Sequence, residues 1–196
     1  MKRDEVAAFA ARYDPDPPHS RQVERLSLLL FDALAPLHRL GEAAREFLSS
    51  AALLHDIGWV GGVQGHHKRS CLMVLEDTTL PFGEEERTLV ALVARYHRRA
   101  LPARKHRLFA ALSPEDQATV SALAAILRVA DGLDVGHAGA VADLACTVGE
   151  EAVTVVLTPC GPVDAEVRAA EKKGDLFRAI YRRDLVVRPR EQNGQV

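Results

Sequence analysis

Apolar residues recur at helical spacing over most of the chain up to about residue 138, and this limits the fold to helices packed around a common core. The clearest run spans residues 19–40, where the repeating residues are Val23, Leu26, Leu30, Leu34 and Leu37. Within this run Pro36 is expected to kink or end the helix. Before it, the DPDPP segment at 14–18 ends a short helix expected at 3–13, because proline cannot continue a helix.

Further helices follow from the same periodicity. They are expected at 42–56, at 67–77 and from about 84 to 98. Another begins at Ser113, which is a good N-cap because Pro114 takes the first helical position and Asp116 the third. The sequence that follows, ATVSALAAILRVADGLD, is so apolar that this last helix should be buried on most sides.

Beyond Gly136 the pattern changes. The expected elements are a β-hairpin formed by 144–148 and 153–157, a helical stretch at 162–182 and a last strand at 184–188. The predicted fold is therefore mostly α, with a helical bundle at 1–138 and a small α/β appendage at 139–190. No long linker separates the two parts, so they should pack together.

Composition excludes several classes of protein. Hydrophobic residues make up 47% of the 196 residues and charged residues 27%, as in ordinary globular domains. The net charge of -2 means that any binding of polyanions must come from a local patch. Cys71, Cys146 and Cys160 form no CxxC motif, which favours a reducing cytoplasm over a disulfide framework. The chain shows no signal peptide and no apolar run of about 20 residues, so no membrane span is expected.

The dipeptide His55-Asp56 ends an apolar helix in AALLHDIGW. An ionised carboxylate buried at such a helix end without a partner costs several kcal/mol. A divalent cation removes this cost and explains the adjacent imidazole. For the dipeptide alone, the alternative is a histidine and a capping aspartate with a structural role only.

Two further residues fit the same interpretation. Asp131 lies among apolar residues in LAAILRVADGLD, where the alternative is a salt bridge to Arg128 three residues earlier. His19 begins a helix directly after the prolines, where the alternative is a histidine on a solvated turn. Together the ordered set is His19, then His55-Asp56, then Asp131. Two imidazoles and two carboxylates suit Mn²⁺, Fe²⁺, Mg²⁺ or Zn²⁺ and leave positions open for water and phosphate.

The order H…HD…D on a helical core resembles the HD superfamily of metal-dependent phosphohydrolases, through roughly residues 13–138. A narrower resemblance is carried by HSRQVERLSLLLFDAL, LLHDIGW, GHHKRS, ARYHRR and ILRVADGLD. These segments are similar to the C-terminal HD-like region of the exopolyphosphatase/guanosine pentaphosphate phosphatase family. That family also has a small α/β segment after the core.

Members of that family carry two actin-like domains in front of this region, and those domains hold their phosphatase site. The resemblance therefore implies a free-standing version of the C-terminal region here, because residues 1–18 could not supply such domains. The family's activity on polyphosphate does not carry over directly. The metal site does, since all of its residues are present.

A basic cluster adds a second chemical signal. The segment ARYHRRALPARKHR holds Arg98 and Arg99 and no acid, and Lys68 lies beside the glycine-rich loop that follows HDIG. These three side chains are predicted to neutralise a leaving phosphate. The alternative is a solvated loop without a function. The cluster is too short for a specific reader of duplex nucleic acid, and no recognition-helix motif accompanies it.

The leading prediction is thus a metal-dependent phosphohydrolase acting on a nucleotide, an alarmone or polyphosphate. The sequence does not distinguish phosphatase, phosphodiesterase and pyrophosphohydrolase activities. The first alternative is a regulatory module that binds such an anion without turnover, and a weaker one is a helical interaction protein without metal. The appendage is expected either to close the site or to form a homodimer.

A second metal ion requires further imidazoles, and the candidates are His97 and one histidine of GHHKRS. Histidines in this interval are what the resemblance to binuclear HD proteins implies. His67 is preferred over His66, because His67 is expected to begin the helix and His66 to belong to the loop. We expect one tight ion and a second, weaker ion that depends on bound phosphate. The alternative is that His67 and His97 bind substrate phosphate.

Overall fold

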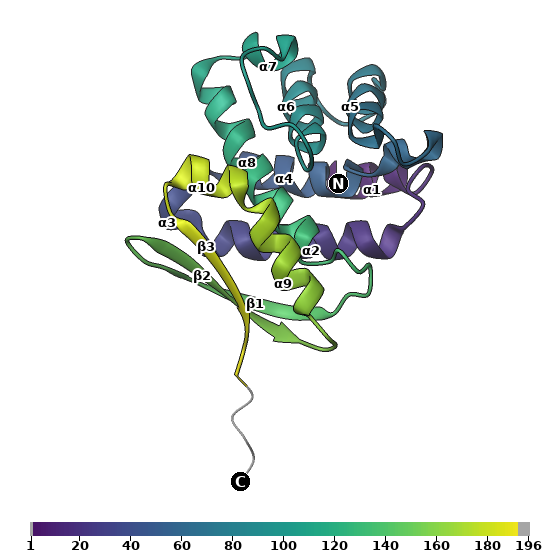
Figure 1. Cartoon of the computed structure of the whole chain (residues 1–196). Helices are drawn as coiled ribbons and strands as arrows, with labels where there is room; N and C mark the ends of the chain where they lie inside the picture. The colour runs from purple at the N-terminus through teal and green to yellow at the C-terminus, as the bar shows by residue number, and fades with distance from the viewer. Residues whose placement is uncertain (1, 192–196) are drawn as a thin grey trace.

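The computed structural model describes residues 2–191 and confirms a mostly α fold with a small α/β part (Figure 1). The long helices of the bundle are α1 (Lys2–Ala10), α2 (Pro17–Ala33), α4 (Glu42–Leu54), α5 (His66–Glu76), α6 (Glu84–Arg95) and α8 (Pro114–Gly132). Short turns of helix lie between them: α3 (Ala35–His38), the 3-10 helix η1 (Ile57–Gly61) and α7 (Arg107–Ala110). None of the described helices is both long enough and apolar enough to cross a membrane.

Prolines explain where α2 begins and where it ends. Pro17 and Pro18 occupy its first turn, and the side chain of Asp16 caps it by accepting the backbone N–H of His19 at 3.3 Å. The apolar run expected to continue to residue 40 breaks at Leu34, the boundary between α2 and α3. Pro36 accounts for the break, because its ring clashes with the carbonyl four residues earlier.

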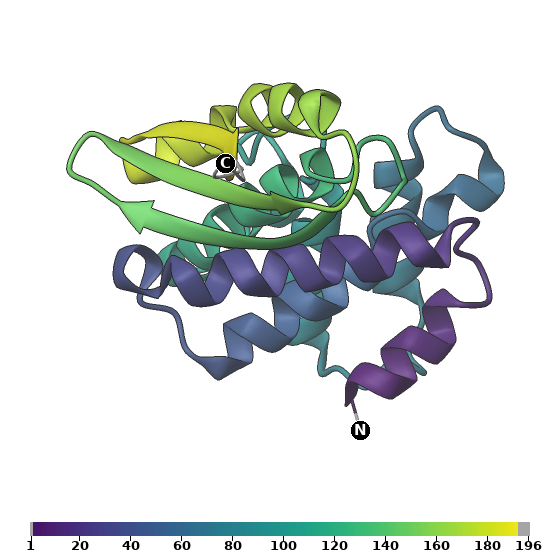
Figure 2. The ribbon, with the colours of Figure 1, turned by 90° about the horizontal axis from the view of Figure 1, so that it is seen from below.

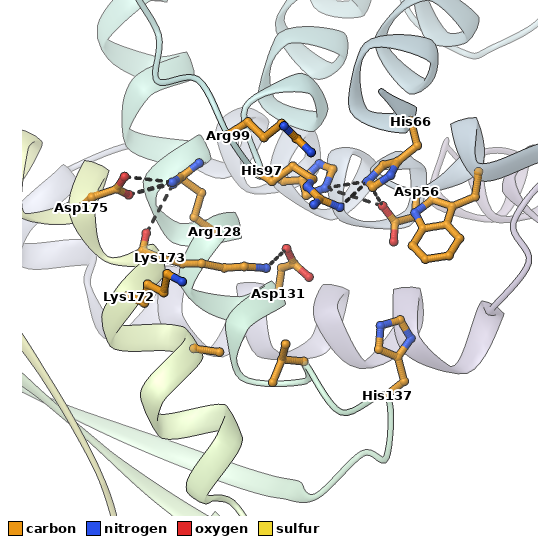
Figure 3. Close-up of a pocket in the computed structure, with 14 residues that line it drawn as sticks. Asp56, His66, His97, Arg99, Arg128, Asp131, His137, Lys172, Lys173 and Asp175 are labelled. Carbon is orange, nitrogen blue, oxygen red and sulfur yellow. Dashed lines mark hydrogen bonds and ion pairs between the residues drawn. The ribbon is translucent and has the colours of Figure 1, made fainter. Parts of the chain in front are cut away.

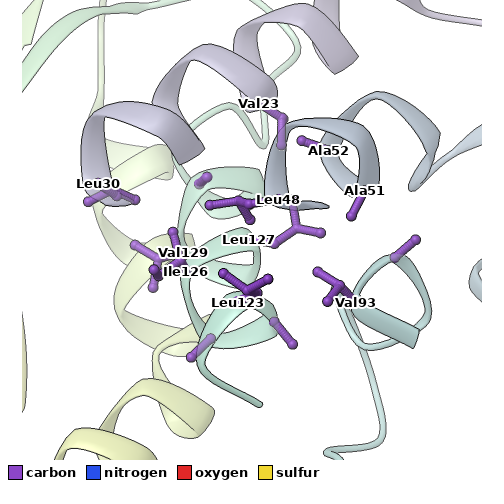
Figure 4. Close-up of a cluster of buried hydrophobic side chains, with 14 of the residues drawn as sticks. Val23, Leu30, Leu48, Ala51, Ala52, Val93, Leu123, Ile126, Leu127 and Val129 are labelled. Atoms are coloured by element: carbon purple, nitrogen blue, oxygen red, sulfur yellow. The ribbon is translucent and has the colours of Figure 1, made fainter. Parts of the chain in front are cut away.

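Helix α8 forms the centre of the bundle. The Ser113 hydroxyl accepts the N–H of Asp116 at 3.1 Å, so the predicted N-cap is present. Nearly all residues from Val120 onward are buried, and α2, α4 and α6 pack around the helix. Figure 4 shows Leu123 and Leu127 of α8 facing apolar side chains of the neighbouring helices. This apolar shell also surrounds the last turn of α8, which carries Asp131.

The α/β part contains β1 (Val141–Val148), β2 (Ala152–Pro159), α9 (Asp164–Lys173), α10 (Asp175–Tyr181) and β3 (Asp184–Pro189). Strands β1 and β2 form the predicted antiparallel hairpin, and β3 returns parallel to β2 after the two helices. Every second residue of β2 and β3 is buried, so one face of the sheet packs on helices, with β1 against α2 and β3 against α9 and α10 (Figure 1 and Figure 2).

The α/β part and the bundle share one apolar core. Leu176, Phe177 and Leu185 belong to the same buried cluster as Leu127. Helix α9 packs directly on α8, so it lies beside the end of the helix that carries Asp131. The division between 138 and 139 stays a prediction.

Candidate metal centre

Six buried side chains from five segments of the chain meet at one end of the bundle. His19 comes from the first turn of α2, His55 and Asp56 from the end of α4, and Asp131 from the last turn of α8. His66 begins α5, and His97 follows α6. Each of the six is at most 8% exposed. The structure therefore brings together the ordered set predicted from the sequence, although these residues are far apart in the chain.

All four imidazoles are held by a hydrogen bond at Nδ1. Three bond the carbonyl three residues earlier: His55 to Ala52 at 2.7 Å, His66 to Val63 at 2.8 Å and His97 to Ala94 at 2.7 Å. His19 Nδ1 instead lies 2.7 Å from a carboxylate oxygen of Asp134. A carbonyl oxygen can only accept, so Nδ1 carries the proton in the first three rings. When these rings are neutral, their Nε2 atoms are therefore left with a free lone pair.

The Nε2 atoms of all four rings face the carboxylates of Asp56 and Asp131. His66 Nε2 lies 3.0 Å and His97 Nε2 3.6 Å from Asp56 Oδ1, while His55 Nε2 lies 3.5 Å from Asp56 Oδ2. His19 Nε2 lies 3.6 Å from Asp131 Oδ1. The result is two groups of possible ligand atoms, His19–His55–Asp56 and Asp56–His66–His97, each within 4.8 Å. Asp56 belongs to both groups and turns a different oxygen toward His55 than toward His66 and His97.

The ligand atoms fit a cation because imidazole nitrogens and carboxylate oxygens face one another at short distances. His66 Nε2 and His97 Nε2 are only 3.3 Å apart. His55 Nε2 and Asp56 Oδ1 are buried without a hydrogen-bond partner among the described residues. Unsatisfied buried polar atoms are rare in proteins and cost free energy. Imidazole nitrogens and carboxylate oxygens are ligands that divalent transition metals accept.

The protonation states agree with this arrangement. Burial lowers the pKa of His97 to about 3, so that ring is neutral at neutral pH. Burial opposes ionisation of Asp56, but protons held by the surrounding imidazoles when no metal ion is bound keep the pKa of this carboxyl well below its usual range. Burial would also lower the pKa of His19, but Asp131 and Asp134 raise it to about 10.

A supporting layer around His19 was not anticipated from the sequence. Asp134 holds Nδ1 of His19 with one oxygen, and its other oxygen accepts the N–H of Gly139 at 2.8 Å. The ring of His137 stacks on His19, with centroids 3.8 Å apart, and bonds Asp16 at 2.7 Å. The one sequence signal was the second aspartate in ADGLD, three residues after Asp131, where a helix brings side chains to the same face.

The structure corrects the choice between the two adjacent histidines. His66, rather than His67, reaches Asp56 and His97. Helix α5 begins at His66, one residue earlier than expected, and successive residues on a helix point about 100° apart. His67 is buried as well, and burial lowers its pKa to about 4, but it belongs to neither ligand group.

The alternative salt bridge between Asp131 and Arg128 is not formed. Arg128 turns toward α10, where it bonds Asp175 at 2.8 Å, and also toward the carbonyl of Tyr96 at 3.2 Å. Asp131 is instead paired with the ammonium group of Lys173, which comes from α9 (Figure 3). Only the packing of the α/β part against α8 creates this contact.

A pocket of about 640 Å³ opens over the centre. Its lining includes Asp56, His66, His97 and Asp131, together with the basic residues Arg98, Arg99, Arg128, Lys172 and Lys173. Arg98 and Arg99 thus lie where the sequence predicted them, and Arg98 reaches 3.4 Å from His66 Nε2. Lys68 does not line this pocket, because its side chain is exposed on α5. The two lysines of α9 were missed by the sequence interpretation.

The neighbour of Lys68 has a structural role. Arg69 is bonded to three carbonyls of the glycine-rich loop, those of Gly58 at 2.8 Å, Gln64 at 2.8 Å and Gly62. Gly58 must be glycine, since a Cβ there would lie 2.3 Å from the carbonyl oxygen of His66. This close approach fixes the start of α5, and with it the ring of His66, against the end of α4.

Comparison with known protein families shows to which family the chain belongs. The family described as Ppx/GppA phosphatase, domain III, matches residues 2–163. The chain belongs to this family. The part that matches the Ppx/GppA domain III family contains all six side chains of the candidate centre, together with Arg98 and Arg99. Lys172 and Lys173 lie beyond the matched residues.

Proposed function

We propose that this member of the Ppx/GppA domain III family is an HD-type, metal-dependent phosphohydrolase. Its substrate would be a small, phosphate-rich anion such as a nucleotide, an alarmone or polyphosphate. The observation that carries the proposal is the convergence of four imidazole Nε2 atoms on two buried carboxylates at the floor of a basic pocket. Perturbed titratable groups gathered in a cleft are typical of functional sites.

The residues divide into two ligand groups. His19, His55, Asp56 and Asp131 would hold a first divalent ion, and Asp56, His66 and His97 a second, with Asp56 shared. When bound, such an ion supplies Lewis-acid chemistry, polarising a phosphoryl oxygen and lowering the pKa of water. We expect the first ion to bind more tightly, because two carboxylates serve it and the basic side chain of Arg98 lies next to His66.

The surrounding side chains bind and orient the substrate. Arg98 and Arg99 present guanidinium groups at the edge of the centre, where they can hold phosphate oxygens and neutralise the charge of a leaving phosphate. Lys172 faces the same pocket from α9. Asp134 keeps the His19 ring in one orientation through its bond to Nδ1. The basic side chains would thus position a phosphate beside the ligand cluster, and Asp134 would orient one of the ligands.

A phosphate-release screen tests the proposal. The protein would be assayed with Mn²⁺, Fe²⁺, Mg²⁺ and Zn²⁺ against phosphomonoesters, phosphodiesters, nucleoside triphosphates, alarmones and polyphosphate. Asp56→Asn should abolish turnover, whereas Asp32→Asn, an exposed aspartate on α2 paired with Arg45, should leave it unchanged. Saturable binding of one of these anions without phosphate release, under every metal, would instead support a regulatory binding module.

A further inference from the structure

The pairing of Lys173 with Asp131 links the α/β part to the ligand cluster. The ammonium group of Lys173 contacts Asp131 Oδ2, while Oδ1 of the same carboxylate faces His19 Nε2 at 3.6 Å. Figure 3 shows the lysine extended from α9 along the pocket with its end on Asp131. The Lys173 side chain is 26% exposed, whereas that of Asp131 is 11% exposed. The lysine therefore reaches the carboxylate from the solvent side.

Close packing of two helices fixes this position. A Cβ on Gly132 would lie 2.7 Å from both Cα and N of Ala170, so the backbones of α8 and α9 touch there. Gly132 directly follows Asp131, and Ala170 precedes Lys173 by three residues on the same helix. The contact between lysine and aspartate is therefore set by the helix backbones rather than by a flexible loop.

Lys173 and a divalent ion need the same carboxylate. Asp131 is one of two carboxylates in the cluster, and it is buried against apolar residues of α8. A buried carboxylate without a counter-charge is costly, so some cation must accompany it in every state of the protein. With a divalent ion bound, the charge of Lys173 is no longer required at Asp131. The same lysine lines the pocket together with Lys172, Arg98 and Arg99, where a phosphate would lie.

We propose that Lys173 is an exchangeable counter-ion, which neutralises Asp131 in the metal-free protein and binds substrate phosphate once a divalent ion is held. This inference rests on the proposed metal-dependent function. It assigns the α/β part a direct role in the site, as the source of a residue that contacts substrate. It also predicts that one substitution changes two affinities in opposite directions.

The test uses Lys173→Met, which keeps an unbranched side chain of similar length and removes its charge. Calorimetric titration with Mn²⁺, without phosphate, should show metal binding tightened by roughly tenfold, the equivalent of one charge-assisted hydrogen bond. Titration of the Mn²⁺-loaded variant with inorganic phosphate should show binding weakened by a similar factor. A lysine that only stabilised the fold would not give these opposite changes.

Two further variants control for charge and position. Lys172→Met removes a neighbouring pocket cation that is not paired with Asp131, so its Mn²⁺ affinity should equal that of the wild type. Lys173→Arg restores a cation and should return both affinities toward wild-type values. Thermal melting of the Mn²⁺-loaded variants identifies any that fail to fold, and Lys173→Gln, which also removes the charge, keeps the test decisive if Lys173→Met does not fold.

The outcomes separate this inference from the proposed function. Tighter Mn²⁺ and weaker phosphate binding in Lys173→Met support the exchange. Unchanged or weaker Mn²⁺ binding in that variant overturns it and leaves the metal centre intact. If Lys173→Met does not fold, the same opposite changes in Lys173→Gln support the exchange, and unchanged or weaker Mn²⁺ binding in that variant overturns it. No Mn²⁺ binding by the wild type overturns both proposals.

Discussion

Asp134 Oδ2 lies 2.7 Å from Nδ1 of His19, and this contact turns Nε2 of the same ring toward Asp131. A carboxylate hydrogen-bonded to one nitrogen of a histidine fixes the ring orientation and makes the other nitrogen a stronger metal ligand. Both residues are nearly inaccessible to solvent. The position of His19 in the cluster is therefore set by α2 on one side and by the end of α8 on the other.

Removing the contact between Asp134 and His19 should weaken metal binding without removing a metal ligand. Asp134→Ala leaves His19 free to rotate, and loss of such a partner costs roughly 10–100-fold in metal affinity. Asp134→Asn keeps an oxygen that can accept from Nδ1 and should recover part of the loss. Mn²⁺ titration measures both variants. Wild-type affinity in Asp134→Ala would show that the contact does not orient the ring.

The adjacent histidines His66 and His67 provide a matched pair for the second ion. His66→Ala should abolish the weaker Mn²⁺ site and leave the tighter one, because His66 faces Asp56 and His97. His67→Ala should retain both sites, since His67 belongs to neither ligand group. The number of ions bound, with and without inorganic phosphate, distinguishes them. Loss of the second ion in His67→Ala instead would favour the preference for His67 that the sequence suggests.

The arginine pair at the pocket edge should serve substrate binding rather than stability. Replacing either Arg98 or Arg99 with Met should lower kcat/KM by roughly 10–100-fold, the range expected when a hydrogen bond to a charged phosphate is removed. The melting temperature of the double variant should change little, because Arg99 is exposed and Arg98 half-buried. Lys68→Met, outside the pocket, is the matched control. If the double variant does not fold, the two arginines stabilise the fold rather than bind substrate.

The contact between α8 and α9 should be sensitive to a single methyl group. Gly132→Ala places a Cβ 2.7 Å from backbone atoms of Ala170, which cannot move without shifting α9. Such overpacking costs about 1–3 kcal/mol in the free energy of unfolding. Urea denaturation measures the change. The same unfolding free energy as the wild type would mean that α9 is not held tightly against α8.

The parts of the molecule that the sequence could predict are those governed by local rules. Ser113 is an N-cap because its hydroxyl and Asp116 lie within one turn, which is visible in the sequence. His55, Asp56 and Asp131 stood out because polar residues on apolar helices require a partner. The choice between His66 and His67 depended on a one-residue shift in the start of α5, which lies within the ordinary uncertainty of helix ends.

The contacts that escaped prediction join distant segments. Asp131 could pair with Arg128 by helical spacing alone, yet the structure pairs it with Lys173, 42 residues later. The reason is tertiary: α9 packs on α8 at Gly132, and Arg128 is drawn to Asp175 at the start of α10. Helical periodicity carries no information about which later element covers a given face.

The central claim is that the imidazoles and carboxylates around Asp56 form a metal centre. Asp56 belongs to both ligand groups, so its removal should disrupt both at once. We would load the wild type and Asp56→Ala with Mn²⁺, remove free metal, and measure the bound metal by mass spectrometry. The wild type should retain close to stoichiometric metal, and the folded variant almost none. Equal metal content in the two proteins would contradict the assignment.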